Sequence, residues 1–283
     1  MKHRQRIAVA ARAESPEVCH INLASGFRGG ERQTELLIRA LTETLPRQRL
    51  VTLRGAPLVH RVEGLPGVTV TPVGGRMSAV AAAARAAVIH AHETHGAQVA
   101  LVRNLLSGTP YVVTRRVVSP LTSSPFTRAM YRRASRVVAL SRAIEQVLAG
   151  YEPGIRCVRI PGARAGFEVD RAWVDRFRAR YAGKFIVGHV GAYDFRHKGQ
   201  DVLVEAAAAL ASRHPALHFV LVGEGRDEAR LRELAAGAGN VTVAGWADNV
   251  GDYLAAFDLF AFPSIHEGLG SILFDAMHFG LPM

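Results

Sequence analysis

The stretch FIVGHVGAYDFRHKGQDVLVEAAAALASRHPALHFVLV, residues 185–222, determines the fold class. It begins with an apolar run typical of a buried strand (185–190) and continues through a polar loop into an Ala-rich segment with helical spacing (200–213). It ends in a second apolar run (217–222). Two short apolar runs separated by a helix are typical of parallel strands joined by a crossover helix. The stretch therefore predicts an α/β unit with a parallel sheet.

The same alternation extends over the rest of the chain, which predicts an α/β fold of two Rossmann-like, doubly wound domains. We place them at 1–180 and 181–283, because a turn at Gly183 coincides with a change in charge. Gly280-Leu281-Pro282-Met283 resembles a turn into a further strand, so we expect the second domain to be incomplete. Further strands are expected at 18–23, 49–53, 68–73, 88–92, 111–114, 136–140, 157–160, 240–244 and 258–262. Further helices are expected at 32–45, 77–87, 97–106, 127–134, 141–151, 172–181, 227–236 and 271–279.

Composition excludes several classes of protein. With 49% hydrophobic and 21% charged residues, the chain is typical of a globular protein and unlike a disordered one. No apolar run approaches the roughly 20 residues that cross a bilayer. The basic N-terminus is followed by an apolar run that Arg12 interrupts, a poor match to a secretory signal. Cys19 and Cys157 lack metal-type spacing, so we expect reduced thiols and a cytoplasmic protein.

The net charge of +11 is unevenly distributed. Residues 1–180 contain 28 Lys and Arg against 12 Asp and Glu, whereas residues 181–283 contain 7 against 12. A basic first half is compatible with an anionic membrane surface, a phosphorylated acceptor or nucleic acid, and also with a general preference for arginine. Basic segments with interleaved aromatic residues are lacking, so nucleic acid is not expected. Four arginines at helical spacing are candidates for contact with an anionic surface: Arg128, Arg132, Arg133 and Arg136.

Two segments of the first half carry candidate site residues. Ser25-Gly26-Phe27-Arg28-Gly29-Gly30-Glu31 follows a strand and precedes a helix, where backbone N–H groups can hold an anion and glycine allows close approach. Paired glycines also occur as simple turn formers, and the spacing is that of neither a dinucleotide nor a Walker motif. His90-Ala91-His92-Glu93-Thr94-His95 lies at a strand end. It lacks the spacing of a helical zinc HExxH pair, so no metal is expected there.

Two further segments lie in the second half. Residues 191–201, GAYDFRHKGQD, link a strand to a helix and offer Arg196 and Lys198, which could neutralise a diphosphate or be solvated loop charges. Residues 266–275, HEGLGSILFD, enter a helix with Glu267 before its start and Asp275 inside it. Such acids could accept hydrogen bonds from sugar hydroxyls or could cap the helix.

These segments, in this order, resemble family 4 of the GT-B glycosyltransferases. The resemblance includes the GGxE-type turn at Gly29 to Glu31, the SxxI segment at Ser141, the Lys198-Gly199 pair, the VGxG strand end at Gly223, and the PSxxEG block from Pro263. It covers nearly the whole chain. It implies two Rossmann-like domains facing a cleft, with the nucleotide sugar held mainly by the second domain and the acceptor by the first.

The resemblance also implies roles for individual residues. Lys198, aided by Arg196, would bind the donor diphosphate, and Glu267 would contact the transferred sugar. Asp275 would accept from the ribose and Trp246 would lie near the base. No metal or other cofactor would be required. The remaining donor contacts would come from Gly29, Gly30, Gly268, Gly270 and Ser271.

Three positions depart from the family pattern. Asp275 stands where Glu is usual, and Ala192 follows the strand glycine where Arg is usual. After the strand 111–114, where many members place a histidine near the sugar, this chain has Arg115 and Arg116. His92 or His95 is a candidate for that missing role.

The resemblance thus implies a retaining glycosyltransferase that moves a sugar from a nucleotide-diphosphate donor to a glycan or lipid-linked acceptor. Envelope polysaccharide or lipopolysaccharide synthesis, at the inner face of the membrane, is the expected setting. Two alternatives stay open: a GT-B nucleotide-sugar epimerase, which would need no acceptor, and a degenerate binding subunit without activity.

Overall fold

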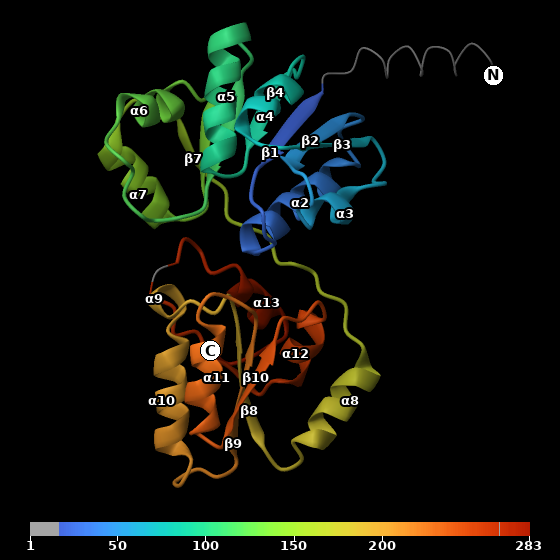
Figure 1. Cartoon of the computed structure of the whole chain (residues 1–283), viewed down its shortest axis with the longest axis vertical. Helices are drawn as coiled ribbons and strands as arrows, with labels where there is room; N and C mark the ends of the chain where they lie inside the picture. Colours follow the sequence, from blue (N-terminus) through green and yellow to red (C-terminus); the bar gives the residue numbers. More distant parts are fainter. Residues whose placement is uncertain (1–16, 266) are drawn as a thin grey trace, which may run out of the picture. The chain divides into compact units, whose positions relative to one another are not determined.

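The computed structural model describes residues 17–265 and 267–283, so residues 1–16 and His266 lie outside the described residues. The chain divides into two units, Met1–Ala163 and Arg164–Met283, each built on a parallel sheet (Figure 1). The predicted fold class, α/β with two Rossmann-like units, is confirmed.

The first unit contains a seven-stranded parallel sheet in the order β3-β2-β1-β4-β5-β6-β7. The chain builds outward from β1 to β3 and then returns to place β4 on the other side of β1. The strand order therefore reverses between β1 and β4, the position where ligands bind in open α/β sheets. The strands are β1 (Val18–Asn22), β2 (Gln48–Leu53), β3 (Val68–Val73), β4 (Val88–Ala91), β5 (Tyr111–Arg115), β6 (Arg136–Ala139) and β7 (Cys157–Arg159).

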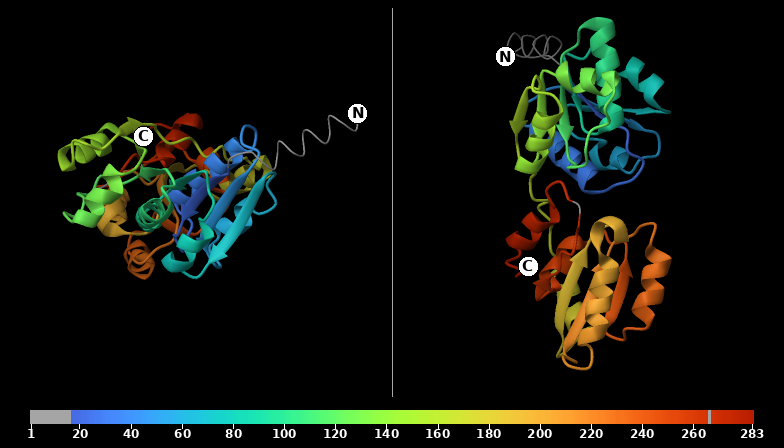
Figure 2. Two further views of the ribbon diagram at one scale, coloured as in Figure 1. Left: turned by 90° about the horizontal axis from the view of Figure 1, so that it is seen from above. Right: turned by 90° about the vertical axis from the view of Figure 1, so that its left-hand side faces the viewer.

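Three helices of this unit begin at a side-chain capping group, namely Glu93, Ser124 and Ser141. Ser124 Oγ accepts from the Thr127 N–H at 3.0 Å, and the Glu93 carboxylate accepts from the first N–H groups of α5. In Figure 2 helices flank both faces of this sheet. The helices are α2 (Gly29–Leu41), α3 (Leu58–Val62), α4 (Arg76–Ala82), α5 (Thr94–Ser107), α6 (Pro125–Arg132) and α7 (Arg142–Tyr151).

The second unit contains a four-stranded parallel sheet in the order β10-β9-β8-β11. The strand order reverses between β8 and β11. At the outer edge of β11 the Pro282 carbonyl accepts from the Phe260 N–H at 2.8 Å. The strands are β8 (Phe185–Val190), β9 (Leu217–Val222), β10 (Val241–Gly245) and β11 (Leu259–Phe260). The helices are α8 (Arg171–Arg180), α9 (Phe195–Lys198), α10 (Gln200–Leu210), α11 (Glu228–Ala236), α12 (Val250–Ala256) and α13 (Ile272–His278).

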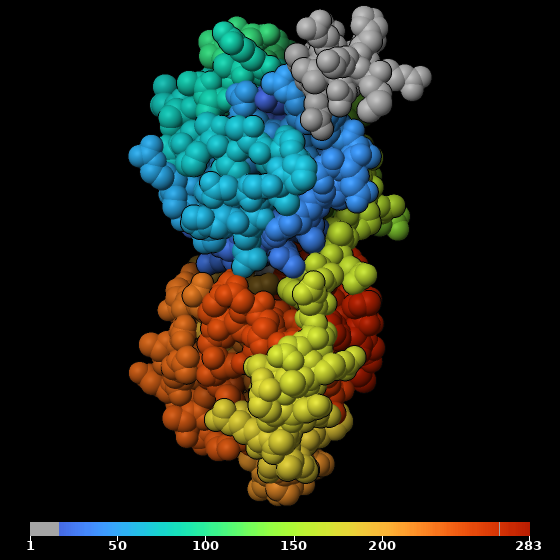
Figure 3. Space-filling model, turned by 90° about the vertical axis from the view of Figure 1, so that its right-hand side faces the viewer, coloured from blue at the N-terminus to red at the C-terminus, as the bar shows by residue number. Residues whose placement is uncertain are grey.

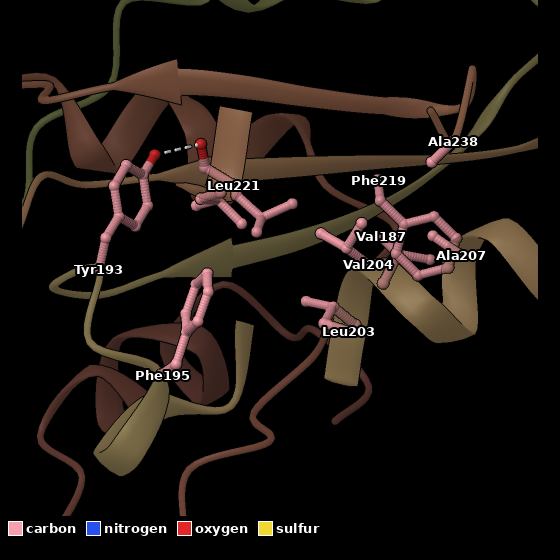
Figure 4. Packing of buried hydrophobic residues seen from close by; sticks show 10 residues of the cluster. Val187, Tyr193, Phe195, Leu203, Val204, Ala207, Phe219, Leu221 and Ala238 are labelled. Atoms are coloured by element: carbon pink, nitrogen blue, oxygen red, sulfur yellow. Dashed lines mark hydrogen bonds between the residues drawn. The ribbon is translucent and has the colours of Figure 1, made fainter. Parts of the chain in front are cut away.

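Apolar packing on one face of the second sheet fixes the loop after β8. Tyr193 and Phe195 are buried in a cluster with Leu203 of α10 and Leu221 of β9 (Figure 4). The Tyr193 hydroxyl donates to the Leu221 carbonyl at 2.8 Å, so this buried polar group is satisfied. The residues just before Lys198 are therefore attached to the core.

The boundary between the units lies at Ala163/Arg164, so the predicted boundary at 180/181 is wrong. Helix α8 belongs to the second unit, because Trp173 and Phe177 stack and both pack against Tyr253 of α12, with ring centroids 4.7–5.4 Å apart. Arg178 adds a two-pronged ion pair with Asp258, with distances of 2.7 and 2.6 Å. Figure 3 shows α8, in yellow, along the surface of the second unit.

Among the described residues, no helix combines sufficient length with an apolar composition to cross a bilayer.

Candidate functional site

The predicted site residues follow the carboxyl ends of parallel strands in both units. In the second unit Lys198 comes after β8, Trp246 after β10 and Glu267 after β11. In the first unit Gly29 comes after β1, and Arg116 comes directly after β5. Carboxyl ends of parallel strands share one edge of a sheet, so each group gathers at a single edge.

Lys198 and Glu267, 69 positions apart, form an ion pair between Nζ and Oε1. Both side chains are about a quarter exposed, so the pair is partly screened from water. The His197 carbonyl accepts from the Ile265 N–H at 2.9 Å, which joins the two loops that carry the pair. The structure thus brings together the two residues to which the resemblance assigns the diphosphate and the sugar.

Gly199 allows this close approach. Its φ is +64°, a conformation that side chains disfavour, and it ends α9. A Cβ at this position would lie 2.6 Å from the Pro263 carbonyl oxygen, so only glycine fits. In the Lys198-Gly199 pair, the lysine therefore supplies the positive charge, and the glycine leaves room for the loop that contains Pro263.

The turn after β8 is held by His189 and Gln200, which the sequence analysis did not identify. The Gln200 side-chain amide donates to the Ala192 carbonyl at 2.8 Å, and its nitrogen lies 3.3 Å from His189 Nε2. His189 Nδ1 lies 3.0 Å from the Ala261 carbonyl, so it carries the hydrogen and Nε2 accepts. Burial lowers the pKa of His189 to about 4, which keeps the ring neutral at pH 7.

Asp275 is buried, and its Oδ1 accepts from the backbone N–H of Ala165 at 2.6 Å. The carboxylate therefore attaches the start of the second unit to α13, a contact that the sequence did not predict. Its role toward a ribose stays a prediction. Of the other predicted donor contacts, Arg196 and Trp246 are exposed, and Ser271 precedes α13 beside Gly270, whose φ is +65°.

We expect Asp275→Ala to lower the free energy of unfolding by about 1–3 kcal/mol, because the buried Ala165 N–H would lose its acceptor. Met277→Ala on the exposed side of the same helix is the matched control. Denaturant unfolding of the two variants measures the difference. Equal stability of both would mean that the hydrogen bond contributes nothing.

At the start of α2, the Arg116 side chain packs against Gly30. A Cβ at Gly30 would lie 3.5 Å from Arg116 Cδ. Glu31 lies in the first turn of α2 and accepts from the Arg28 N–H at 2.8 Å. Burial lowers the pKa of Arg116 to about 10 and the Glu31 charge opposes that shift, so the guanidinium stays charged at pH 7. A cation thus stands beside the glycine turn.

Three histidines lie together on the paired strands β1 and β4: His20 in β1, His90 in β4, and His92 just after β4. Their ring centroids are 4.1–5.8 Å apart, and their nearest possible ligand atoms lie within 4.8 Å of one another. Burial lowers the pKa of His20 to about 4 and of His90 to about 3, and holds that of His92 well below its usual value. His20 was absent from the sequence prediction.

Two of the sugar-proximal candidates lie elsewhere. Arg115 is buried and donates to the Tyr131 hydroxyl at 3.2 Å and to the Ser119 carbonyl, so it supports the unit's interior. Successive strand residues point to opposite faces, which separates Arg115 from Arg116. His95 is exposed in the first turn of α5, beside the Glu93 carboxylate that caps that helix.

Residues 184–283 match the family model described as "Glycosyl transferases group 1". This part of the chain is related to the group 1 glycosyltransferases. The predicted resemblance is thereby confirmed, and the matched region begins one residue before β8 and includes Lys198, Glu267 and Asp275.

Individual proteins named as glycosyltransferases are also similar to the chain. The lipopolysaccharide core biosynthesis glycosyltransferase LpsE of Rhizobium meliloti is 30% identical over 172 residues, covering 59% of this chain and 48% of that protein. The 2-deoxystreptamine glucosyltransferase of Streptomyces kanamyceticus is 28% identical over 207 residues, covering 63% and 53%. The chain therefore spans about half the length of the curated relatives that it matches.

A solved structure shares the fold. HepE of Anabaena, solved in complex with UDP and glucose, superimposes with a TM-score of 0.78 at 20% identity, covering 94% of this chain and 79% of that one. Both Rossmann-like units of the chain thus have counterparts in a known structure.

Proposed function

We propose that the chain catalyses sugar transfer from a nucleoside-diphosphate sugar to an acceptor hydroxyl, with retention of the anomeric configuration. The observation that carries the proposal is the Lys198–Glu267 pair at the edge of the second sheet, close to the point where the strand order reverses. The names of the relatives and the UDP and glucose bound to HepE support it.

In the proposed reaction the bond between the anomeric carbon and the diphosphate oxygen breaks. Lys198 stabilises the negative charge that grows on the departing diphosphate, and Arg196 adds a second cation nearby. The acceptor oxygen forms the new bond to the same carbon, and its proton passes to the leaving phosphate oxygen. Glu267 orients the sugar through its hydroxyl groups, and Trp246 offers a face to the base.

We propose that no metal takes part in this step. Lysine and arginine side chains supply positive charge at the edge of the second sheet, and the N–H groups of Gly29 and Gly30 add an anion-binding turn in the first unit. Donor turnover in the presence of a strong chelator, compared with turnover after added magnesium or manganese, tests this point.

The proposal is tested by incubating the chain with a panel of nucleotide sugars, with and without glycan and lipid-linked acceptors. Release of the nucleoside diphosphate together with a new glycoside of unchanged anomeric configuration, seen by NMR, is the expected result. Interconversion of the donor sugar without an acceptor would identify an epimerase. Nucleotide binding without turnover would identify a binding subunit.

We further propose that a lipid-linked acceptor is met at an anionic membrane surface on the cytoplasmic side, through α6. Arg128, Arg132 and Arg133 line a pocket together with Ser123 and Ser124 at the start of that helix. Phe126 beside them is about half exposed. Arginine with an exposed aromatic ring suits an interface of phosphate headgroups and acyl chains. The name of the lipopolysaccharide core relative supports such an acceptor.

We expect Arg132→Gln to weaken binding to vesicles containing an anionic phospholipid about fivefold, since one arginine near such a surface contributes about 1 kcal/mol. Arg136 begins β6 outside the pocket, so Arg136→Gln is a control of equal charge and should bind nearly as well as the unaltered chain. Sedimentation with vesicles at two salt concentrations measures both. Binding that ignores salt and lipid charge would contradict the membrane contact.

A further inference from the structure

A chain of hydrogen bonds joins side chains from four neighbouring strands of the first sheet. Gln48 of β2 lies 3.1 Å from His20 Nε2 of β1, and His20 Nδ1 lies 3.0 Å from Nε2 of His92, which follows β4. His92 Nδ1 in turn lies 3.4 Å from a terminal nitrogen of Arg116, which follows β5. At the other end the Gln48 amide nitrogen donates to the Ile38 carbonyl at 3.1 Å.

The two ends of this series of hydrogen bonds determine which atom donates and which accepts at each step. The Ile38 carbonyl can only accept, so the Gln48 amide turns its nitrogen toward Ile38 and its oxygen toward His20. His20 must then carry its hydrogen on Nε2 and accept on Nδ1. His92 likewise donates from Nε2 and accepts on Nδ1, and an arginine, which can only donate, faces that atom.

Burial preserves this order of donors and acceptors at neutral pH. Gln48, His20 and His92 are at most 1% exposed, and burial lowers the pKa of His20 to about 4. Burial holds the pKa of His92 well below its usual value, and the His90 and His20 rings and the Arg116 guanidinium, which a proton on Nδ1 would face, lower it further. Both rings therefore remain neutral acceptors toward the arginine side.

The series of hydrogen bonds begins and ends at the same helix, α2. Ile38 lies in the body of α2, and Arg116 packs against Gly30 in the first turn of α2. The Arg116 Nε also lies 3.4 Å from the His92 carbonyl, so two atoms of His92 face the guanidinium. The Arg116 guanidinium, with its five N–H groups, is thus held at the carboxyl edge of the sheet. It lies beside the free backbone N–H groups in the first turn of α2.

We infer that Arg116 binds a phosphate group of the substrate, and that Gln48, His20 and His92 are positioning residues that hold its guanidinium at the Gly30 turn. Arginine presents paired N–H donors that match phosphate oxygens, and a helix start offers further N–H groups to the same anion. This inference rests on the proposed function only for the source of the phosphate.

A metal ion is the competing occupant of the same histidines, because their ligand atoms are close enough to share one. In the hydrogen-bonded arrangement, however, the lone pair of His20 Nδ1 receives the His92 hydrogen, and that of His92 Nδ1 faces Arg116. Metal binding would break both interactions, so it becomes an outcome of the test.

The first experiment reads the tautomers in the full chain by long-range proton–nitrogen NMR of labelled histidine. We expect His20 and His92 to be neutral, with hydrogen on Nε2, at every pH from 7 down to 5. Hydrogen on Nδ1, a charged ring at pH 7, or stoichiometric binding of added Zn²⁺ that displaces these signals would overturn the inference.

The second experiment measures binding of inorganic pyrophosphate by calorimetry. Arg116→Met should weaken binding about tenfold or more, which is the range for a lost charge-assisted hydrogen bond. Gln48→Leu should weaken binding about fivefold. Thr52→Val, also in β2, is the control, because the buried Thr52 hydroxyl makes no hydrogen bond within the described part of the chain. Unchanged affinity in Arg116→Met, or undetectable binding by the unaltered chain, would reject the phosphate site.

Unchanged affinity in Gln48→Leu together with a loss in Arg116→Met would reject the positioning role. If Gln48→Leu fails to fold, the same comparison is made with Gln48→Met, which keeps the length of the side chain and removes both the amide acceptor toward His20 and the amide donor toward Ile38. Absence of sugar transfer with the expected tautomers and pyrophosphate affinities would contradict the proposed function alone. Transfer with the opposite tautomers would contradict this inference alone.

Discussion

Replacing Lys198 with alanine is expected to lower the rate of sugar transfer about a hundredfold or more, because removal of one group that stabilises transition-state charge has effects of that order. The ammonium group is already directed by Glu267 and by the loop contact at Gly199, so little rearrangement is needed when the diphosphate departs. Stability should change little, since the pair is partly exposed and such pairs contribute about 0–1 kcal/mol.

Steady-state kinetics with a saturating donor, together with thermal unfolding, measures this prediction. Lys184→Ala is the matched control, because Lys184 lies just before β8, at the opposite end of the strand from Lys198, and donates to the Pro215 carbonyl. Glu267→Gln should also reduce transfer while retaining the fold. Unchanged turnover in Lys198→Ala would remove the leaving-group role, and a large loss of stability in Glu267→Gln would favour a capping role for that acid.

Acidification is expected to destabilise the chain steeply below about pH 6.5, the usual histidine pKa. The pKa values of His20 and His189 fall to about 4 in the folded state, whereas the unfolded chain binds protons from about pH 6.5 downward. The unfolded state therefore holds more protons in this window. Stability from each ring is complete above pH 6.5 and is lost as pH falls through the folded pKa.

Each such histidine should lower the free energy of unfolding by about 1.4 kcal/mol per pH unit between those limits. Denaturant titrations at pH 7.0, 5.5 and 4.5, values chosen to bracket about one to two units of this window, measure the slope. His60 is exposed, so His60→Gln should leave the slope unchanged. A flat profile down to pH 4.5 would mean that the rings are solvated in the folded protein.

The fold was predictable because the apolar runs have strand length and the segments between them have helical spacing. Helices α3 and α9, of five and four residues, were missed, since so few residues do not establish a helical period, and α12 was missed as well. The boundary was misplaced because α8 carries many arginines, as the first unit does. Its attachment through Trp173 and Phe177 depends on tertiary contacts that the sequence does not display.

The site was predictable only in part. Lys198 and Glu267 were found through an ordered set of motifs, and both lie after strand ends, where topology brings them together. His92 was named as a candidate, but Gln48 and His20 were not found, because they come from two further strands whose pairing must be known first. Arg115 is the last residue of β5 and Arg116 is the next one, so extending the alternation of the strand by one residue could have separated them.

Gly199 limits which substitutions the sequence can accumulate at this position. Its backbone conformation and the carbonyl of Pro263 exclude every side chain, so any replacement must push the Pro263 loop away and carry Glu267 with it. In a saturation-mutagenesis library selected for transfer, position 199 should therefore tolerate glycine alone. Val202, three residues later and exposed, should accept many substitutions. Tolerance at 199 comparable to that at 202 would show that the two loops move independently.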